Sequence, residues 1–295
     1  MKHNPIITIV LLLMFLATQL IGLYVVHHYS DKELPLNLGT PEIQDEKDYG
    51  PVFVSILIAF VIAIGLLLLL THFKAEFIMK LWFLLVVVIA LVISLMSFIP
   101  TFPYVTLVVL LLVIPLAIVK IYGQNFLIHN LTELFIYPGI AAVFVPLLNI
   151  WTVIALLIAI SLYDMWAVWK SGIMQKMARY QIDKVKAFAG FFVPYISKRT
   201  KMKLKKMKKS ELKKKKIKAN VAILGGGDVI FPIITAGVMM KTFPETIIPA
   251  LLVITGAALG LTYLFLFAKK KKFYPAMPFI TAGIAIGIGL SYLIF

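Results

Sequence analysis

The stretch Leu224-Gly225-Gly226-Gly227-Asp228-Val229-Ile230-Phe231-Pro232 places an aspartate directly after three glycines, near the start of an apolar segment. An acidic side chain inside a membrane span costs about 2.5–3.5 kcal/mol on insertion scales, so its presence indicates a function. A second aspartate, Asp164, follows Tyr163 near the end of the preceding apolar segment. The two acids can be tested against the rest of the chain.

The composition is that of a polytopic membrane protein. Of the 295 residues, 61% are hydrophobic and 14% charged, and the mean hydropathy is +0.98, far from an ordinary soluble domain. The chain has no cysteine, which excludes disulfides, thiolate metal sites and a cysteine nucleophile. Its five histidines form no His-x-x-x-His pair, so we expect no metal site and no cofactor.

Apolar runs long enough to cross a bilayer, about 17–25 residues each, recur nine times and predict an all-α polytopic membrane protein with nine transmembrane helices. Residues 1–169 contain six of the spans, 170–220 form a basic loop, and 221–295 contain the other three, all in one membrane domain. We expect the spans at 6–26, 51–71, 81–99, 104–119, 131–145, 150–169, 221–240, 246–267 and 275–295.

One loop carries the whole charge imbalance of the protein. The formal net charge is +16, and residues 170–218 alone hold 18 Lys and Arg against Asp183 and Glu211. Placing this loop and the N-terminus in the cytoplasm leaves only Lys32, Lys47 and Lys241 outside, so we expect a multi-pass cell-membrane protein with an extracellular C-terminus. The loop is expected to contact anionic lipid head groups rather than nucleic acid.

Two parts of this loop differ in character. Residues 187–196 are apolar and aromatic, too short to span, and predicted to lie at the membrane interface. Residues 197–218 are Lys-rich and of low complexity, typical of a solvated tether or a frayed surface helix.

Asp164 and Asp228 are predicted to lie at similar depth. Asp164 comes six residues before Lys170 and Asp228 ten after Lys218, which corresponds to about 9 and 15 Å of helical rise from the charged borders. Gly225, three residues before Asp228, is expected on the same helical face, where it lets a partner approach, while Pro232 weakens the helix beside the acid. Three glycines inside a helix would each cost about 1 kcal/mol.

A pair of carboxylates suits peptide hydrolysis, because one activates water as a base and the other protonates the amide nitrogen. Two such groups in one site share a proton, which also lowers the charge held in the membrane. Either aspartate can start as the base, and we expect an optimum at or below neutral pH. The alternative is that each acid is an isolated span-end residue facing water. Glu133, at the entrance of the fifth span, is interpreted as an interface residue.

A third element, Pro275-Ala276-Met277-Pro278, opens the last span on the same side as the acids. Its prolines could leave backbone groups free to bind an extended substrate. A simple helix start explains the same spacing, since proline is common there. The pairs Gly256/Gly260 and Gly283/Gly287 are spaced for helix packing.

These residues resemble the presenilin and signal peptide peptidase family of intramembrane aspartyl proteases. Tyr163-Asp164 is similar to the family's Tyr-Asp motif, Gly225-Gly226-Gly227-Asp228 to its Gly-x-Gly-Asp motif, and Pro275-Ala276-Met277 to its Pro-Ala-Leu motif. Met277 replaces the usual leucine with a side chain of similar size, so we expect little loss.

The resemblance extends over the whole chain, and it implies a presenilin-like fold of the compact microbial, archaeal type. It implies an aspartic endopeptidase with Asp164 and Asp228 as catalytic residues, and with Tyr163, Gly225, Gly226, Gly227, Pro275, Ala276 and Met277 as substrate-binding or supporting residues. The expected substrates are transmembrane helices of other proteins. The alternative function is a transporter or a cation or proton leak channel that uses the same carboxylates, although no inverted repeat is evident. The sequence leaves oligomeric state, natural substrate and self-cleavage of the loop open.

Overall fold

The structure is a computed structural model that describes residues 5–38, 43, 45–123, 125–171, 189–195, 220–268 and 274–295. Within these residues it has nine long helices, as the hydropathy pattern predicts, and one small sheet. The long helices are α1 Pro5–His28, α2 Tyr49–His72, α3 Glu76–Met96, α4 Val105–Tyr122, α5 Phe126–Phe144, α6 Ile150–Trp166, α10 Gly226–Thr242, α11 Ile248–Phe267 and α12 Met277–Ile294. The shorter elements are the turns η1 Pro35–Asn37, η2 Glu46–Asp48, η3 Val145–Leu147 and η4 Ala167–Ser171, and the strands β1 Gly190–Tyr195 and β2 Asn220–Gly225.

Eight of these helices are long and apolar enough to cross a membrane by length and composition. The exception is α10, which has 17 residues because it begins at Gly226; α6 has the same length, but η4 continues it to give a run of 21 residues, Ile150–Lys170. The predicted start of this span at Val221 is therefore wrong: residues up to Gly225 form β2. The sequence could not show this difference, because a short apolar run is compatible with a buried strand as well as with a helix.

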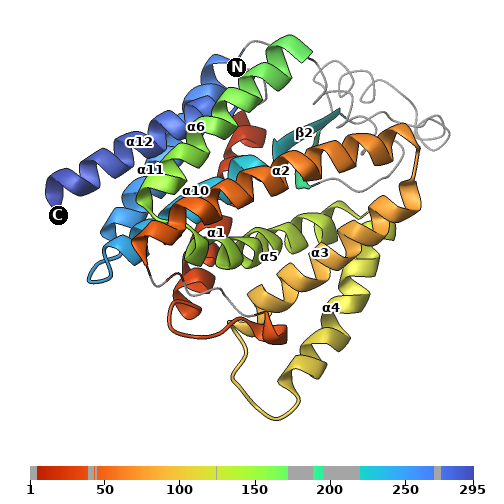
Figure 1. The fold of residues 1–295 in the computed structure, drawn as a ribbon. Helices are drawn as coiled ribbons and strands as arrows, with labels where there is room; N and C mark the ends of the chain where they lie inside the picture. The colour runs from red at the N-terminus through yellow and green to blue at the C-terminus, as the bar shows by residue number, and fades with distance from the viewer. Residues whose placement is uncertain are drawn as a thin grey trace.

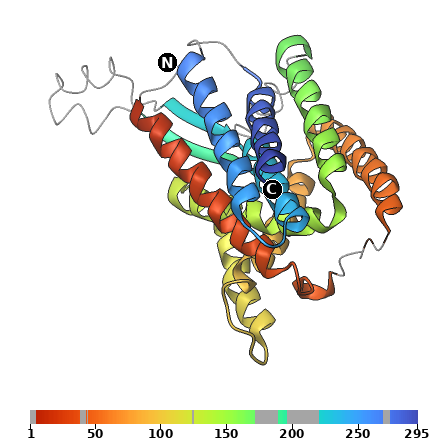
Figure 2. The same cartoon turned by 90° about the vertical axis from the view of Figure 1, so that its left-hand side faces the viewer.

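The bundle is built around α10. This helix contacts α1, α5, α6, α11 and α12, and Figure 1 shows it inside the molecule, while α2 runs along the outside. The 90° view agrees, with α2 at the edge of the bundle (Figure 2), where it contacts α3 and α6. Helices α3 and α4 pack on α5, on its side away from α10 (Figure 1). The core therefore surrounds α10, whereas α2 has only one buried residue, Tyr49.

The tightest helix pair is α11 with α12, where the glycines expected to serve packing do so. A Cβ on Gly256 would overlap the carbonyl of Gly283, and a Cβ on Gly283 would overlap that of Gly256. Gly260 and Gly287 lie equally close to the opposite backbone. Such close backbone approach is how small residues drive helix association in membranes.

The segment predicted to lie at the membrane interface contains a strand of a small, partly buried sheet. β1 pairs antiparallel with β2, in a register that sets Gly190 opposite Gly225 and Phe192 opposite Ile223. β1 packs on α5 and α1, and Phe191 is fully buried against the Tyr137 ring. Phe191 is thus part of the core, whereas Pro194 is exposed and Phe192, Val193 and Tyr195 are half-buried. The Lys-rich stretch 197–218 lies outside the described residues.

Candidate active site

Asp228 lies in the first turn of α10, at the junction between strand and helix. β2 ends at Gly225, which caps α10 in an extended conformation, and Asp228 is the third residue of the helix. Its half-buried carboxyl group faces the backbone N–H of Gly225, as an acidic residue does at this position of a capping box. A Cβ on Gly225 would lie 3.2 Å from Asp228 Oδ2, so glycine leaves room for the carboxyl group.

The expectation of three glycines inside a helix is therefore wrong. Gly225 precedes the helix, and Gly226 and Gly227 are its first two residues. At a helix start the conformational cost of glycine inside a helix does not apply. Gly226 is needed for packing, because a Cβ there would lie 2.9 Å from both Cε1 and the hydroxyl oxygen of Tyr137. The estimate of depth from helical rise fails too, since part of the intervening chain is extended.

Asp164 lies in the last turn of α6 and is buried, with 6% of its surface exposed. Its Oδ2 accepts a hydrogen bond from the Met277 N–H at 3.1 Å. Met277 is the first residue of α12, so the positive end of that helix faces the carboxylate. The π turn η4 follows α6 directly, and such turns are frequent at functional sites.

The structure thus brings Pro275-Ala276-Met277 to Asp164 through a regular helix start, the simpler of the two readings of this segment. Ala276 caps α12, and Pro278 is at a position of the first turn that needs no N–H partner. One turn away, the hydroxyls of Ser161 and Thr281 lie 2.8 Å apart and join α6 to α12. The Asp164 side of the site is therefore fixed by two polar contacts between these helices.

The two aspartates lie on neighbouring helices. α6, which carries Asp164, packs against α10, which carries Asp228, and both pack against α12. Each carboxylate lies at the N-terminal end of a helix. Asp228 is in the first turn of its own helix, α10, and Asp164 of α6 faces the first turn of α12. The side chain of Tyr163 is directed toward α2. It is half-buried, and its ring contacts that of Phe60, with 6.2 Å between the ring centroids.

The sequence interpretation missed several residues around Asp228. Gln19 of α1 is fully buried and donates a hydrogen bond from Nε2 to the Val229 carbonyl at 2.9 Å. It could have been found by the reasoning used for the acids, since a polar side chain in an apolar span is costly. Glu133 is not an interface residue, because it is 1% exposed and forms an ion pair with Lys120. No group of three or more metal-ligating side chains occurs among the residues that the structure describes.

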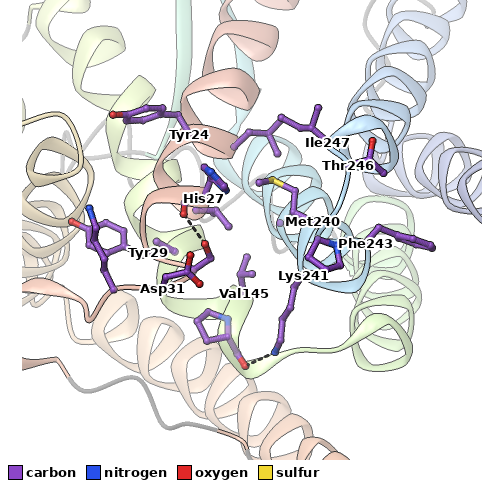
Figure 3. Close-up of a pocket in the computed structure, with 18 of the residues that line it drawn as sticks. Tyr24, His27, Tyr29, Asp31, Val145, Met240, Lys241, Phe243, Thr246 and Ile247 are labelled. Atoms are coloured by element: carbon purple, nitrogen blue, oxygen red, sulfur yellow. Dashed lines mark hydrogen bonds between the residues drawn. The ribbon is translucent and has the colours of Figure 1, made fainter. Parts of the chain in front are cut away.

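Neither Asp164 nor Asp228 lines either of two cavities in the structure. The larger, of about 1140 Å³, lies where α1 and α10 end, and Figure 3 shows that both polar and apolar side chains line it. There Lys241 donates hydrogen bonds to the Tyr49 hydroxyl at 2.5 Å and to the Pro146 carbonyl at 3.3 Å. Because Asp228 is at the other end of α10, this cavity is remote from the acids. The smaller, of about 390 Å³, is an apolar groove between α2 and α6 that reaches Tyr163.

The fold and the site define a multi-pass membrane protein with two carboxylates inside its helical bundle. Residues 7–295 match the family model described as signal-peptide peptidase, presenilin aspartyl protease, so the chain belongs to this family. It is accordingly an aspartic endopeptidase of the membrane. None of the curated proteins compared with it is a match.

Two solved structures are similar in fold, each described as a presenilin family intramembrane aspartate protease. The one in space group C222 is 19% identical, has a TM-score of 0.61, and covers 98% of this chain and 99% of its own. The one in space group P2 is 18% identical, with a TM-score of 0.62 and full coverage of both chains. The architecture is therefore shared from end to end.

Proposed function

We propose that this protease uses Asp164 and Asp228 as a catalytic dyad that hydrolyses peptide bonds within transmembrane segments of other proteins. The observation that carries the proposal is that the helices bearing the two aspartates, α6 and α10, pack against each other, while Asp228 lies in the first turn of α10 and Asp164 accepts a hydrogen bond from the first turn of α12. One carboxylate takes a proton from water, and the water oxygen attacks the scissile carbonyl carbon. The other, protonated, carboxyl group gives its proton to the amide nitrogen as the C–N bond breaks. Either aspartate can take either role at the start.

The groove between α2 and α6 supports lateral entry of a substrate helix. Its lining is entirely apolar except for the hydroxyl of Tyr163, next to Asp164 in the chain. α2 has few contacts with its neighbours, so it can move without breaking a packed core. The groove is lined by Leu57, Phe60, Val61, Ile64, Leu156, Ala159, Ile160 and Tyr163.

A bound substrate must be unwound near the acids, because the peptide carbonyls of a helix are hydrogen-bonded and hidden. The outer edge of β2 offers a partner for the extended chain. The side chain of Asn130 on α5 donates a hydrogen bond to the Phe192 carbonyl at 2.7 Å and accepts one from the Phe192 N–H at 2.9 Å. Both groups of Phe192 therefore point away from β2, which makes its pair with Ile223 the non-hydrogen-bonded kind.

The same geometry directs the N–H and C=O of Ile223 to the edge of β2 that faces away from β1, where no other strand pairs among the residues that the structure describes. Ile223 is also 39% exposed. β2 leads directly into Gly225 and Asp228. A substrate strand added at this edge would run past the dyad, with its backbone held by hydrogen bonds that do not depend on its sequence.

Cleavage of a single-span peptide by the purified protein tests the dyad. We expect the wild type to cut it and Asp164→Asn and Asp228→Asn each to lose at least a thousandfold in kcat, because an amide replaces neither the base nor the acid. Normal cutting by either variant would exclude the dyad. The rival function, a channel or transporter that uses these carboxylates, predicts ion or proton flux in liposomes that both substitutions abolish.

A further inference from the structure

Helix α5 carries a row of polar side chains, one turn apart, that leads from the end of α4 to the turn containing Asp228. The row consists of His129, Glu133 and Tyr137, and Lys120 of α4 joins it. Lys120 Nζ lies 2.5 Å from Glu133 Oε1, and both side chains are buried, 7% and 1% exposed. A buried ion pair contributes little to stability compared with apolar side chains of similar volume. Its presence is therefore better explained by what it holds in place.

His129 connects the ion pair to the sheet. Its Nε2 lies 2.8 Å from the Gly190 carbonyl, which only accepts, so this nitrogen carries the hydrogen. Its Nδ1 lies 3.4 Å from Lys120 Nζ, which only donates, so Nδ1 is the acceptor. The ring is neutral in this arrangement, and it ties Lys120 to the first residue of β1.

Gly190 in turn determines where the catalytic turn lies. It pairs with Gly225, the cap of the Asp228 helix, and the adjacent Ala189 carbonyl accepts the N–H of Gly226 at 3.2 Å. The row on α5 therefore reaches the backbone on both sides of the junction between β2 and α10.

Tyr137 reaches the same turn directly. Its ring lies against Gly226, two residues before Asp228, and leaves no room for a side chain there. Glu133 lies one turn before Tyr137 on α5, and neither the Tyr137 hydroxyl nor Glu133 Oε2 has a hydrogen-bond partner among the described residues. The Tyr137 ring thus joins the part of α5 that carries Glu133 to Gly226.

We infer that Glu133, held by Lys120, is a positioning residue for Asp228: through His129 and β1, and through Tyr137 and Gly226, it fixes the turn that carries the catalytic carboxyl group. The inference rests on the proposed function for its kinetic consequence. Glu133 is one helix away from the reacting atoms, so the expected effect falls on kcat rather than on substrate binding.

The test compares Glu133→Gln, Lys120→Met and the double variant. Each single change leaves one buried group without its partner, so a loss of folding would be uninformative by itself. The double variant removes both charges and keeps the volume. We expect its unfolding temperature to return close to that of the wild type, while its kcat stays at least tenfold lower and its KM changes by less than twofold. Recovery of kcat together with stability would overturn the inference and leave the pair a merely structural role.

Hydrogen–deuterium exchange gives a readout that does not require cleavage. In the double variant we expect amides of residues 220–229 to exchange at least tenfold faster, with α11 and α12 unchanged. Unchanged exchange in 220–229 would overturn the inference even if the wild type cuts its peptide. Faster exchange with a wild type that cuts nothing would support the inference and reject the proposed function. The control is Lys241→Met, which breaks the Lys241–Tyr49 contact at the other end of α10 and should leave exchange in 220–229 unchanged.

Discussion

At the scale of single residues, the site depends on glycines, which leave room for neighbouring side chains. Gly225 makes room for the Asp228 carboxyl group and Gly226 for the ring of Tyr137. Gly227 is different, since a Cβ there would meet only Phe231, at the ordinary contact distance of 3.7 Å. The three adjacent glycines therefore have three different environments, and the packing requirement falls on the middle one.

Gly226→Ala should lower both activity and stability. The new methyl group would lie 2.9 Å from a buried ring, and overpacking of this kind costs about 1–3 kcal/mol. Because the ring and the turn must separate, we expect kcat to fall at least tenfold and the unfolding temperature to drop, measured by peptide cleavage and thermal denaturation. Gly289→Ala is the control, since a Cβ at Gly289 meets nothing within 4 Å. Equal behaviour of the two variants would refute the packing argument.

The importance of Asp164 and Asp228 was predictable because an acid in an apolar span is costly whatever its surroundings. The misinterpretation of Glu133 has a physical cause. Its partner Lys120 belongs to a different helix, and hydropathy places both residues at span ends, where charged groups are ordinarily solvated. Only the packing of α4 on α5 shows that the pair is buried.

At the scale of elements, the change from strand to helix at Gly225 determines the geometry of the site. Eight helices follow from hydropathy because each is long and apolar. The strands do not, because they are six residues each and pair across a long basic segment. No local pattern specifies such a pairing, and Phe191 and Phe192 are compatible with an interfacial segment as well as with a buried strand.

Proline substitutions on β2 test the proposed substrate edge. The N–H of Ile223 points outward, whereas the next residue in the ladder, Ala222, has its N–H directed at β1. We expect Ile223→Pro to keep the unfolding temperature within a few degrees and to raise the KM of a peptide substrate at least fivefold. Ala222→Pro should instead destabilise the fold, because it removes a bond of the ladder. Unchanged KM in the Ile223 variant would exclude this edge as a binding surface.

At the scale of the whole molecule, contacts between loops and helix ends show which of them lie at the same end of the bundle. Tyr29, after α1, donates to the Ile93 carbonyl near the end of α3, and Lys241 contacts Pro146 between α5 and α6. Lys120 and His129 lie at the opposite end, beside the sheet. Burial raises the pKa of Tyr29 to about 12, so its hydroxyl stays protonated and this contact should persist through neutral and moderately alkaline pH.

The distribution of lysine and arginine predicts which end is cytoplasmic, and single-cysteine labelling tests it. The chain has no cysteine, so each introduced thiol is the only reporter. We expect a membrane-impermeant maleimide to label Ser30→Cys in intact cells, and Lys74→Cys only after the membrane is opened. The reverse pattern would invert the proposed orientation, and labelling of both positions in intact cells would contradict the assignment of α2 as a span.

The central claim is that Asp164 and Asp228 share one site, and cross-linking tests it most directly. Asp164→Cys and Asp228→Cys are combined in one chain, with a specific protease site inserted in the Lys-rich run 201–216. A short dithiol-bridging reagent should keep the two halves together after proteolysis, whereas the pair Ser30→Cys with Asp228→Cys, at opposite ends of the bundle, should separate. Separation of the Asp164 and Asp228 pair in the membrane would contradict the account.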